Sequence, residues 1–262
     1  MTRSGVILTV LLVVSAGLLL QAEEQLRTLS GSCSISTTAN ATAVNLRLER
    51  DDCRDGRDCG STQTQEPLDA FLGFRLEDLK REGAHIDAMI RAEAGTLTCS
   101  GAIHDGRLSG GFQFVPDPLF VSRMAQMGYR DLDSEKLQAY TLFRIGTEWI
   151  HSLEAAGVRS LDSGKLIALR IFHVDAGYVR KLEALGYSNP EAGKLIALKV
   201  QNVDPDEVKQ IRALGYQPTL DELVEMRIFK VTPDFIRRMQ AKGLHDLTIS
   251  KLVQIRIFQL AD

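Results

Sequence analysis

The sequence predicts an α+β multidomain protein in which a small antiparallel β domain precedes an all-α solenoid of five two-helix repeats. Before about residue 114, apolar and polar residues alternate, as is typical of half-buried strands. After it, a glycine followed by a large apolar residue recurs every 28 or 29 residues, at Gly128, Gly157, Gly186, Gly215 and Gly243. Units of this period stack into elongated arrays, and such arrays mostly bind other macromolecules.

The first 22 residues differ from the rest of the chain. Arg3 is their only charge, and Val6 to Leu20 is an uncharged run that ends shortly before Ala22. This pattern predicts a signal peptide over residues 1–22, cleaved after Ala22. A retained anchor is the alternative, although the run is shorter than the ~20 residues that a spanning helix needs. We therefore expect an extracytoplasmic protein that is not stably inserted in a membrane if the signal is cleaved.

Residues 23–114 are predicted to form the β domain. Val44, Leu46 and Leu48 alternate with polar residues, and so do the residues from Leu97 to Ile103. Asp105 and Gly106 follow directly, where a tight hairpin turn needs positive φ. We expect a small sheet or sandwich in which disulfides compensate for a small core.

The cysteines all lie before the repeats, at Cys33, Cys53, Cys59 and Cys99. An even number in an oxidising compartment favours two disulfides, and three pairings are possible. We favour Cys53–Cys59, which would close a turn-like segment, together with Cys33–Cys99 within the sheet. A metal site is the alternative, but only one cysteine pair is close in sequence and no histidine is near it. The prediction is therefore no metal and no cofactor.

Residues 115–262 are predicted to form the repeats. The first helix of a repeat begins at a capping residue, often before proline, as at Asp117, Asp204 and Thr232, and ends at the recurring glycine. The second helices are expected to begin after Asp133, Asp162, Asn189, Thr219 and Thr248. Their apolar residues are predicted to be core: Leu166, Leu169, Ile171, Val174, Leu195, Leu198, Val200, Val203, Leu252, Ile255, Ile257 and Leu260.

Two further columns of residues recur through the repeats. The position after the second apolar core position of the second helix has Thr141 in the first repeat and then cations, at Arg170, Lys199, Arg227 and Arg256. This basic column could bind an acidic peptide, a glycan carboxylate or another anionic polymer. The alternative is pairing within the array, with Asp175, Asp206, Asp234 and Glu183. An aromatic column in the first helices, predicted to be core or half-exposed, comprises Phe120, Trp149, Tyr178 and Phe235, with Glu207 as the exception.

Composition and motifs narrow the functional class. The net charge of −3 gives no reason to expect nucleic acid or an anionic membrane as partner. The five histidines are scattered, and no zinc-protease, nucleophile-elbow, phosphate-loop or dinucleotide motif is present. We therefore predict that the protein is not an enzyme.

The segments VTPDFIRRMQAKGL and GKLIALRIFHVDAGYVRKLEALGY resemble a helical repeat family of exported bacterial proteins. Similar arrays follow the peptidase domain in some membrane metallopeptidase sensors of the β-lactam-antirepressor type. The preceding EAGTLTCSGAIHDGRLSGGFQF is similar to the β segment before such repeats, so the resemblance covers about residues 84–262. It implies a bacterial envelope location and an interaction role; this chain lacks the zinc motif and the multi-span region of the sensors.

Together these observations predict a non-catalytic protein of the bacterial envelope, periplasmic or secreted, that binds a protein or peptide. One alternative is a regulatory partner of an envelope signalling or peptidase sensor system. Another is a protein that binds or hydrolyses cell-wall glycan.

Overall fold

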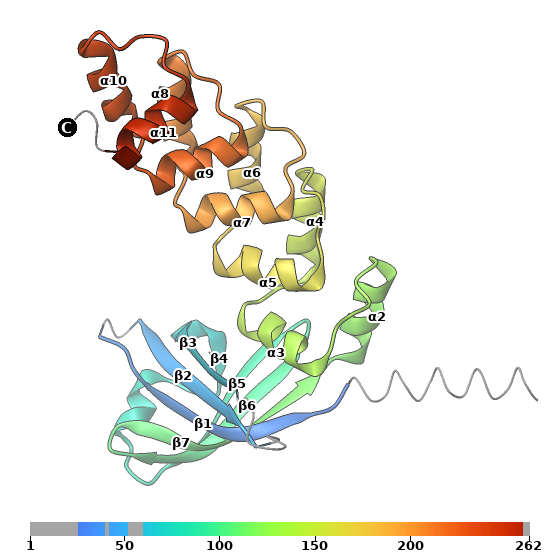
Figure 1. The fold of residues 1–262 in the computed structure, drawn as a ribbon. Helices are drawn as coiled ribbons and strands as arrows, with labels where there is room; N and C mark the ends of the chain where they lie inside the picture. Colours follow the sequence, from blue (N-terminus) through green and yellow to red (C-terminus); the bar gives the residue numbers. More distant parts are fainter. Residues whose placement is uncertain (1–25, 40–41, 52–59, 259–262) are drawn as a thin grey trace, which may run out of the picture. The chain divides into compact units, whose positions relative to one another are not determined.

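A computed structural model describes residues 26–39, 42–51 and 60–258 of the chain (Figure 1). The residues fall into two compact units that meet in the sequence between Gly146 and Thr147. The predicted signal segment 1–22, the Cys53–Cys59 pair and Leu260 lie outside the described residues.

The first unit contains an antiparallel sheet of seven strands in the order β3-β2-β1-β7-β6-β5-β4. The strands are β1 (Leu29–Thr37), β2 (Ala43–Arg50), β3 (Ser61–Pro67), β4 (Phe71–Leu72), β5 (His85–Ala92), β6 (Gly95–His104) and β7 (Arg107–Pro116). One face is apolar and buried, and the other presents mostly serine, threonine and charged side chains. A three-residue 3-10 helix, η2 (Leu68–Ala70), joins the two edge strands β3 and β4, so the sheet curls strongly toward closure.

The disulfide Cys33–Cys99 demonstrates this curvature. It joins β1 to β6, although β7 lies between them in the sheet. In a flat sheet these strands would be about 9.5 Å apart, but the two Cα atoms are 6.0 Å apart. Gly110 of β7 lies opposite Cys33 and Gly101. A Cβ on Gly110 would overlap the backbone of β6, so glycine permits the close approach that bends the sheet into a half-barrel. The Cys33–Cys99 prediction is confirmed.

The predicted fold class is wrong in the size of the sheet, which is large rather than small, whereas a β domain followed by helices is present as expected. The first of the two compact units includes the first helical repeat. Helices α2 (Pro118–Gln126) and α3 (Ser134–Leu142) are part of the sheet unit, where α3 packs on β5, β6 and β7. The curled sheet needs a cover for its apolar face, and α3 provides it (Figure 1). Thr141 and Leu142 are buried there, so a cation in place of Thr141 would lie in the core.

The second unit contains two rows of stacked helices (Figure 1). The first helices of the repeats form one row: α4 (Thr147–Ala155), α6 (Ala176–Glu183), α8 (Pro205–Ala213) and α10 (Pro233–Ala241). The second helices form the other: α5 (Ser163–Ile171), α7 (Ala192–Val200), α9 (Leu220–Ile228) and α11 (Ile249–Phe258). Within each row, every helix contacts the next one. The leucines and valines between the rows, such as Leu166, Leu195 and Leu252, are fully buried.

The helix boundaries follow from local chemistry. Side chains of Asp162 and Thr219 accept hydrogen bonds from the backbone N–H groups of Lys165 and Glu222, as the capping prediction requires. The expected start after Asn189 is wrong. The capping position of α7 is held by Glu191, which makes no side-chain cap bond, while Asn189 adopts a left-handed φ of 50°.

The assignment of three apolar residues to the core is also wrong. Ile171, Val200 and Ile257 are 43%, 45% and 48% exposed. The reason is helical geometry: a residue two positions beyond a buried leucine is rotated by about 200° around the helix axis. Leu169 and Ile171 therefore cannot both face the first-helix row.

Candidate binding surface

An exposed aliphatic column runs along the outer side of the second-helix row. It consists of one β-branched residue from each helix: Ile171, Val200, Ile228 and Ile257. Ile228 is 51% exposed, so the four residues share nearly the same exposure. In α3 the same repeat position holds Leu142, which is only 3% exposed because α3 packs on the sheet. The same helix face is thus covered in one repeat and open in the other four.

The aliphatic column lies within an uncharged face on α5 and α7. One turn before each column residue stand Ile167 and Ile196, both half-buried, and i,i+4 spacing places these pairs on the same side of the helix. The neighbouring outward positions are small: Gly164, Ala168, Gly193 and Ala197. On α9 two of the equivalent positions are acidic, Asp221 and Glu225. The open face is therefore apolar at α5 and α7. At α9 it carries two acids, of which Asp221 forms an ion pair with Lys194 of α7.

The basic column contacts the aromatic column of the first helices. The Arg170 guanidinium lies 5.2 Å from the Trp149 ring centroid, the Lys199 ammonium 4.5 Å from that of Tyr178, and the Arg256 guanidinium 4.8 Å from that of Phe235. Each pair joins the two helices of one repeat. Cation–π contacts of this kind contribute roughly 0.5–2 kcal/mol, depending on how far water is excluded.

The fourth repeat replaces the aromatic residue by an acid. There Arg227 donates from Nη1 to Glu207 Oε2 at 3.0 Å and from Nε to the carbonyl of Gln201 at 3.1 Å. The ion pair takes the place of the cation–π pair. Of the acids considered as partners, Asp206 pairs with Lys209 and Asp234 with Arg237, each within its own helix. The basic column is thus half-buried between the rows and does not form a strip of four solvated cations.

A groove of about 450 Å³ opens beside Lys199. We call it the Lys199 groove; it is lined by Asp175, Gly177, Tyr178, Lys181, Lys199, Asn202, Val203, Asp204 and Pro205. Its floor is fixed by Tyr178, whose hydroxyl donates to the carbonyl of Val203 at 3.0 Å. Burial, with a smaller effect from the Asp204 charge, raises the pKa of Tyr178 to about 12, so the phenol stays neutral and keeps this hydrogen bond.

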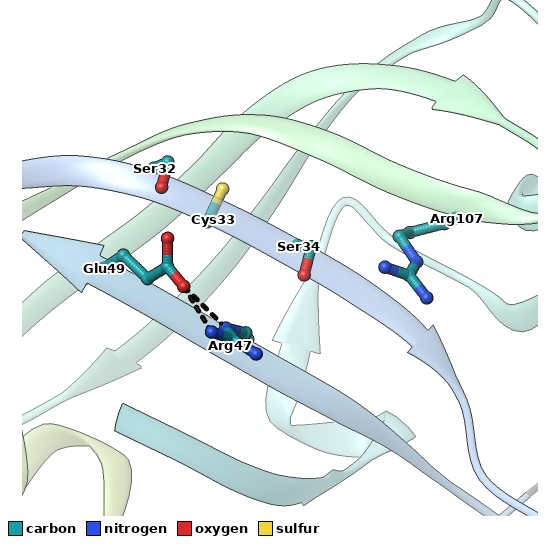
Figure 2. Close-up of a pocket in the computed structure, with 6 residues that line it drawn as sticks. All are labelled: Ser32, Cys33, Ser34, Arg47, Glu49 and Arg107. Atoms are coloured by element: carbon teal, nitrogen blue, oxygen red, sulfur yellow. Dashed lines mark hydrogen bonds and ion pairs between the residues drawn. The ribbon is translucent and has the colours of Figure 1, made fainter. Parts of the chain in front are cut away.

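The polar face of the sheet has a shallow hollow of about 250 Å³ (Figure 2). Ser32 and Ser34 line it from β1, and Arg47 and Glu49 line it from β2. Arg47 donates from Nε to Glu49 Oε1 at 2.8 Å, and both side chains are about half exposed. The charges of this solvated pair cancel, and the remaining charged lining residue, Arg107 of β7, is exposed to water, so the hollow provides little affinity for an ion.

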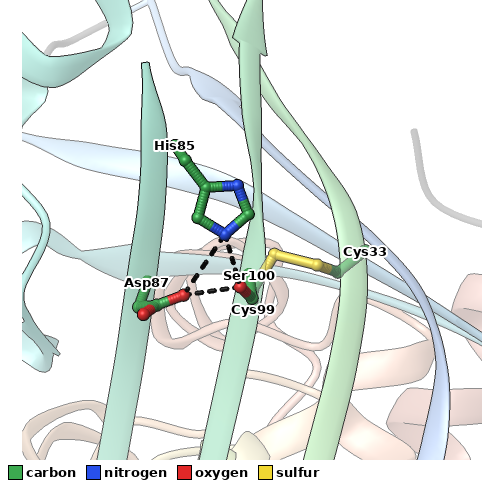
Figure 3. Close-up of a disulfide and its surroundings, with 5 residues drawn as sticks. All are labelled: Cys33, His85, Asp87, Cys99 and Ser100. Atoms are coloured by element: carbon green, nitrogen blue, oxygen red, sulfur yellow. Dashed lines mark hydrogen bonds and ion pairs between the residues drawn. A yellow bond between two sulfur atoms is a disulfide. The ribbon is translucent and has the colours of Figure 1, made fainter.

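A histidine, an aspartate and a serine meet on the same face of β5 and β6 (Figure 3). Ser100 Oγ donates to Asp87 Oδ1 at 2.5 Å, and His85 Nε2 lies 3.0 Å from Ser100 Oγ but 3.8 Å from Asp87. A nucleophilic serine needs its proton directed at the histidine, with the aspartate behind the imidazole. Here the proton points to Asp87, so His85 Nε2 has to donate to Ser100. With His85 and Asp87 both about two-thirds exposed, the cluster resembles an ordinary polar network more than an activated nucleophile.

Over the described ranges, no group of three or more histidine, cysteine or acidic side chains is arranged to hold a metal ion. No helix in the described part of the chain has the length and apolar character needed to span a membrane. Comparisons with protein-family models, curated proteins and solved structures give no match for this chain. The family resemblance therefore stays a prediction, and the function has to be argued from the surface itself.

Sequence reasoning identified the basic and aromatic columns but not their mutual contact, and it missed the aliphatic column. The signal for the aliphatic column was present, since a helical wheel separates Ile171 from Leu166 and Leu169. The His85, Asp87 and Ser100 cluster depends on the register of β5 with β6, in which Asp87 lies opposite Ser100. No local pattern fixes that register.

Proposed function

We propose that this is a non-catalytic, extracytoplasmic protein whose helical unit binds a protein or peptide through the aliphatic column. The observation that supports this best is the repetition of four aliphatic side chains at 43% to 51% exposure, at one place in successive repeats. Single exposed apolar residues are ordinary, but contiguous apolar surface is typical of interaction sites.

The first repeat indicates what kind of surface fits. In α3 the corresponding side chain, Leu142, is buried in a unit where α3 contacts three strands. In the first repeat this helix face is thus covered by other protein segments of the same chain. Stacked helices lie about 8–10 Å apart, close to the ~10.5 Å that two turns of an α-helix span. We propose as the occupant an amphipathic helix with apolar residues two turns apart, lying across α5, α7 and α9.

The location is supported by the Cys33–Cys99 disulfide, because disulfides persist mainly in oxidising compartments. The amino-terminal pattern, Arg3 followed by the uncharged run from Val6 to Leu20, also supports export of the protein. An oxidising, extracytoplasmic setting is therefore part of the proposal.

The test compares two sets of substitutions in the full chain. The column variant combines Ile171→Gln, Val200→Gln and Ile228→Gln, which keep a good helix former at exposed sites. The control variant combines Ala184→Gln, Ala213→Gln and Ala241→Gln, at exposed positions near the ends of the first helices. Each immobilised chain is incubated with envelope extract, and the retained proteins are quantified by mass spectrometry.

We expect a protein that is retained by the wild type and the control variant and lost with the column variant. Its purified form should bind the column variant about tenfold more weakly or worse, since central apolar contacts dominate interface energies. If no retained protein distinguishes the two variants, the proposal fails. If purified cell-wall polymer is the component that the column variant loses, the ligand is a glycan and the protein-binding proposal is wrong.

A further inference from the structure

The Lys199 groove has features that set it apart from the same place in the other repeats. The second residue of α6 is Gly177, whereas the other first helices have larger residues there: Leu119, Glu148, Asp206 and Asp234. Without a side chain at Gly177, the approach to the Tyr178 ring and to Lys199 is open, and the groove of about 450 Å³ results.

Lys199 has no acidic partner among the described residues. Its ammonium is half-buried over the Tyr178 ring, and no carboxylate among the described residues pairs with it. Lys181 lines the same groove and adds a second ammonium, whose charge also acts on the Asp206 carboxylate. A cation over an aromatic face keeps donors free, so it can accept a carboxylate without losing the ring contact.

The fourth repeat shows which group complements this position. There the column cation, Arg227, holds the carboxylate of Glu207 at 3.0 Å, in a pair only 34% and 19% exposed. The third repeat has Tyr178 where the fourth has Glu207, so its own chain supplies no carboxylate at that point.

Two acids also line the groove, but both are engaged with backbone N–H groups. Asp175 accepts from the N–H of Tyr178 at 2.7 Å, and Asp204 accepts from that of Asp206 at 2.9 Å. Their charge is partly offset by these helix N-termini. They therefore weaken the binding of an anion by repulsion but leave the ammonium groups available.

We propose that the Lys199 groove binds the side-chain carboxylate of a glutamate or aspartate in the partner peptide. This inference rests on the proposed function, because the acidic residue would belong to the same partner. It adds a condition on the partner, which must carry an acidic residue next to the apolar residues that contact the aliphatic column.

The test uses a small probe, so that it does not depend on finding the partner. The ¹⁵N-labelled full chain is titrated with N-acetyl-glutamate methylamide, and the amide shifts of Gly177 and Asn202 are followed by NMR. N-acetyl-glutamine methylamide and Nα-acetyl-lysine methylamide serve as neutral and cationic probes. We expect saturable shifts with the glutamate probe and none with the other two.

Three variants assign the binding to the groove. Lys199→Met keeps an apolar contact with Tyr178 and should lower the affinity for the glutamate probe about fivefold, as expected for the loss of a half-exposed ion pair. Lys251→Met, at an exposed lysine of α11 outside the groove, should leave the affinity unchanged. Asp204→Asn retains a good capping side chain but removes a negative charge, so it should strengthen binding.

The inference is overturned if the glutamine or lysine probe binds as well as the glutamate probe, if Lys199→Met has no effect, or if Asp204→Asn weakens binding. None of these variants alters the aliphatic column. A protein partner that depends on the column, together with no response to the glutamate probe, would thus refute this inference alone.

Discussion

The contrast between Leu169 and Ile171 gives the most quantitative prediction. Leu169 is fully buried between the helix rows, and Leu→Ala at such sites costs about 3–5 kcal/mol of stability. Ile171 is 43% exposed. Its substitution by alanine removes three carbon groups at about 0.8 kcal/mol each, scaled by the buried share of somewhat more than half. Alanine regains a few tenths of a kcal/mol in helix propensity. We therefore expect Ile171→Ala to cost about 1 kcal/mol.

The measurement is urea unfolding followed by the fluorescence of Trp149, the only tryptophan of the chain. Trp149 lies on α4, in the same repeat, and its ring contacts Arg170. Both substitutions are therefore read by a probe close to them. Equal destabilisation by the two variants, within about 0.5 kcal/mol, would refute the assignment of one residue to the core and the other to the surface.

Three further predictions concern the sheet and the turns. Replacing Cys33 and Cys99 together by alanine opens a loop with a sequence separation of 66 residues, and thermal unfolding by circular dichroism should show a loss of about 4 kcal/mol; an unchanged midpoint would contradict it. Gly157→Ala should lower the stability of the protein more than Gly215→Ala. Both glycines have positive φ, but only at residue 157 would the new Cβ lie 2.7 Å from another side chain, that of Asn189. Urea midpoints in the reverse order would contradict the structure. Burial raises the pKa of the Glu66 carboxyl above 4.5, so the folded state holds this proton more tightly than the unfolded chain. The free energy of unfolding of the wild type, relative to that of Glu66→Gln, should therefore fall as pH rises above about 4.5. A difference between the two proteins that stays constant across that range would argue against this assignment.

Much of the local structure follows from the sequence because short-range chemistry determines it. Asp162 and Thr219 cap the helices that follow them, and Cys33 pairs with Cys99 as favoured. Asn189 was misleading because Pro190 and Glu191 still precede α7, and Glu191 makes no capping bond that a motif could reveal.

The association of α2 and α3 with the sheet depends on long-range packing, which periodicity does not encode. One residue did carry a trace of it: Thr141 stands where every later repeat has a cation, and it is fully buried. The curvature of the sheet has a similar trace in Gly101 and Gly110, which face each other across β6 and β7. The meaning of these glycines can be recognised only when the strand order is known.

The central claim is that the aliphatic column is an interaction surface. Its most direct test is photo-crosslinking in living cells, with p-benzoylphenylalanine placed at Val200 or, as a control, at Ala213, which is also exposed. The account predicts a discrete crosslinked protein from Val200 and none from Ala213. No crosslinked protein at Val200, or the same product from both positions, would contradict it.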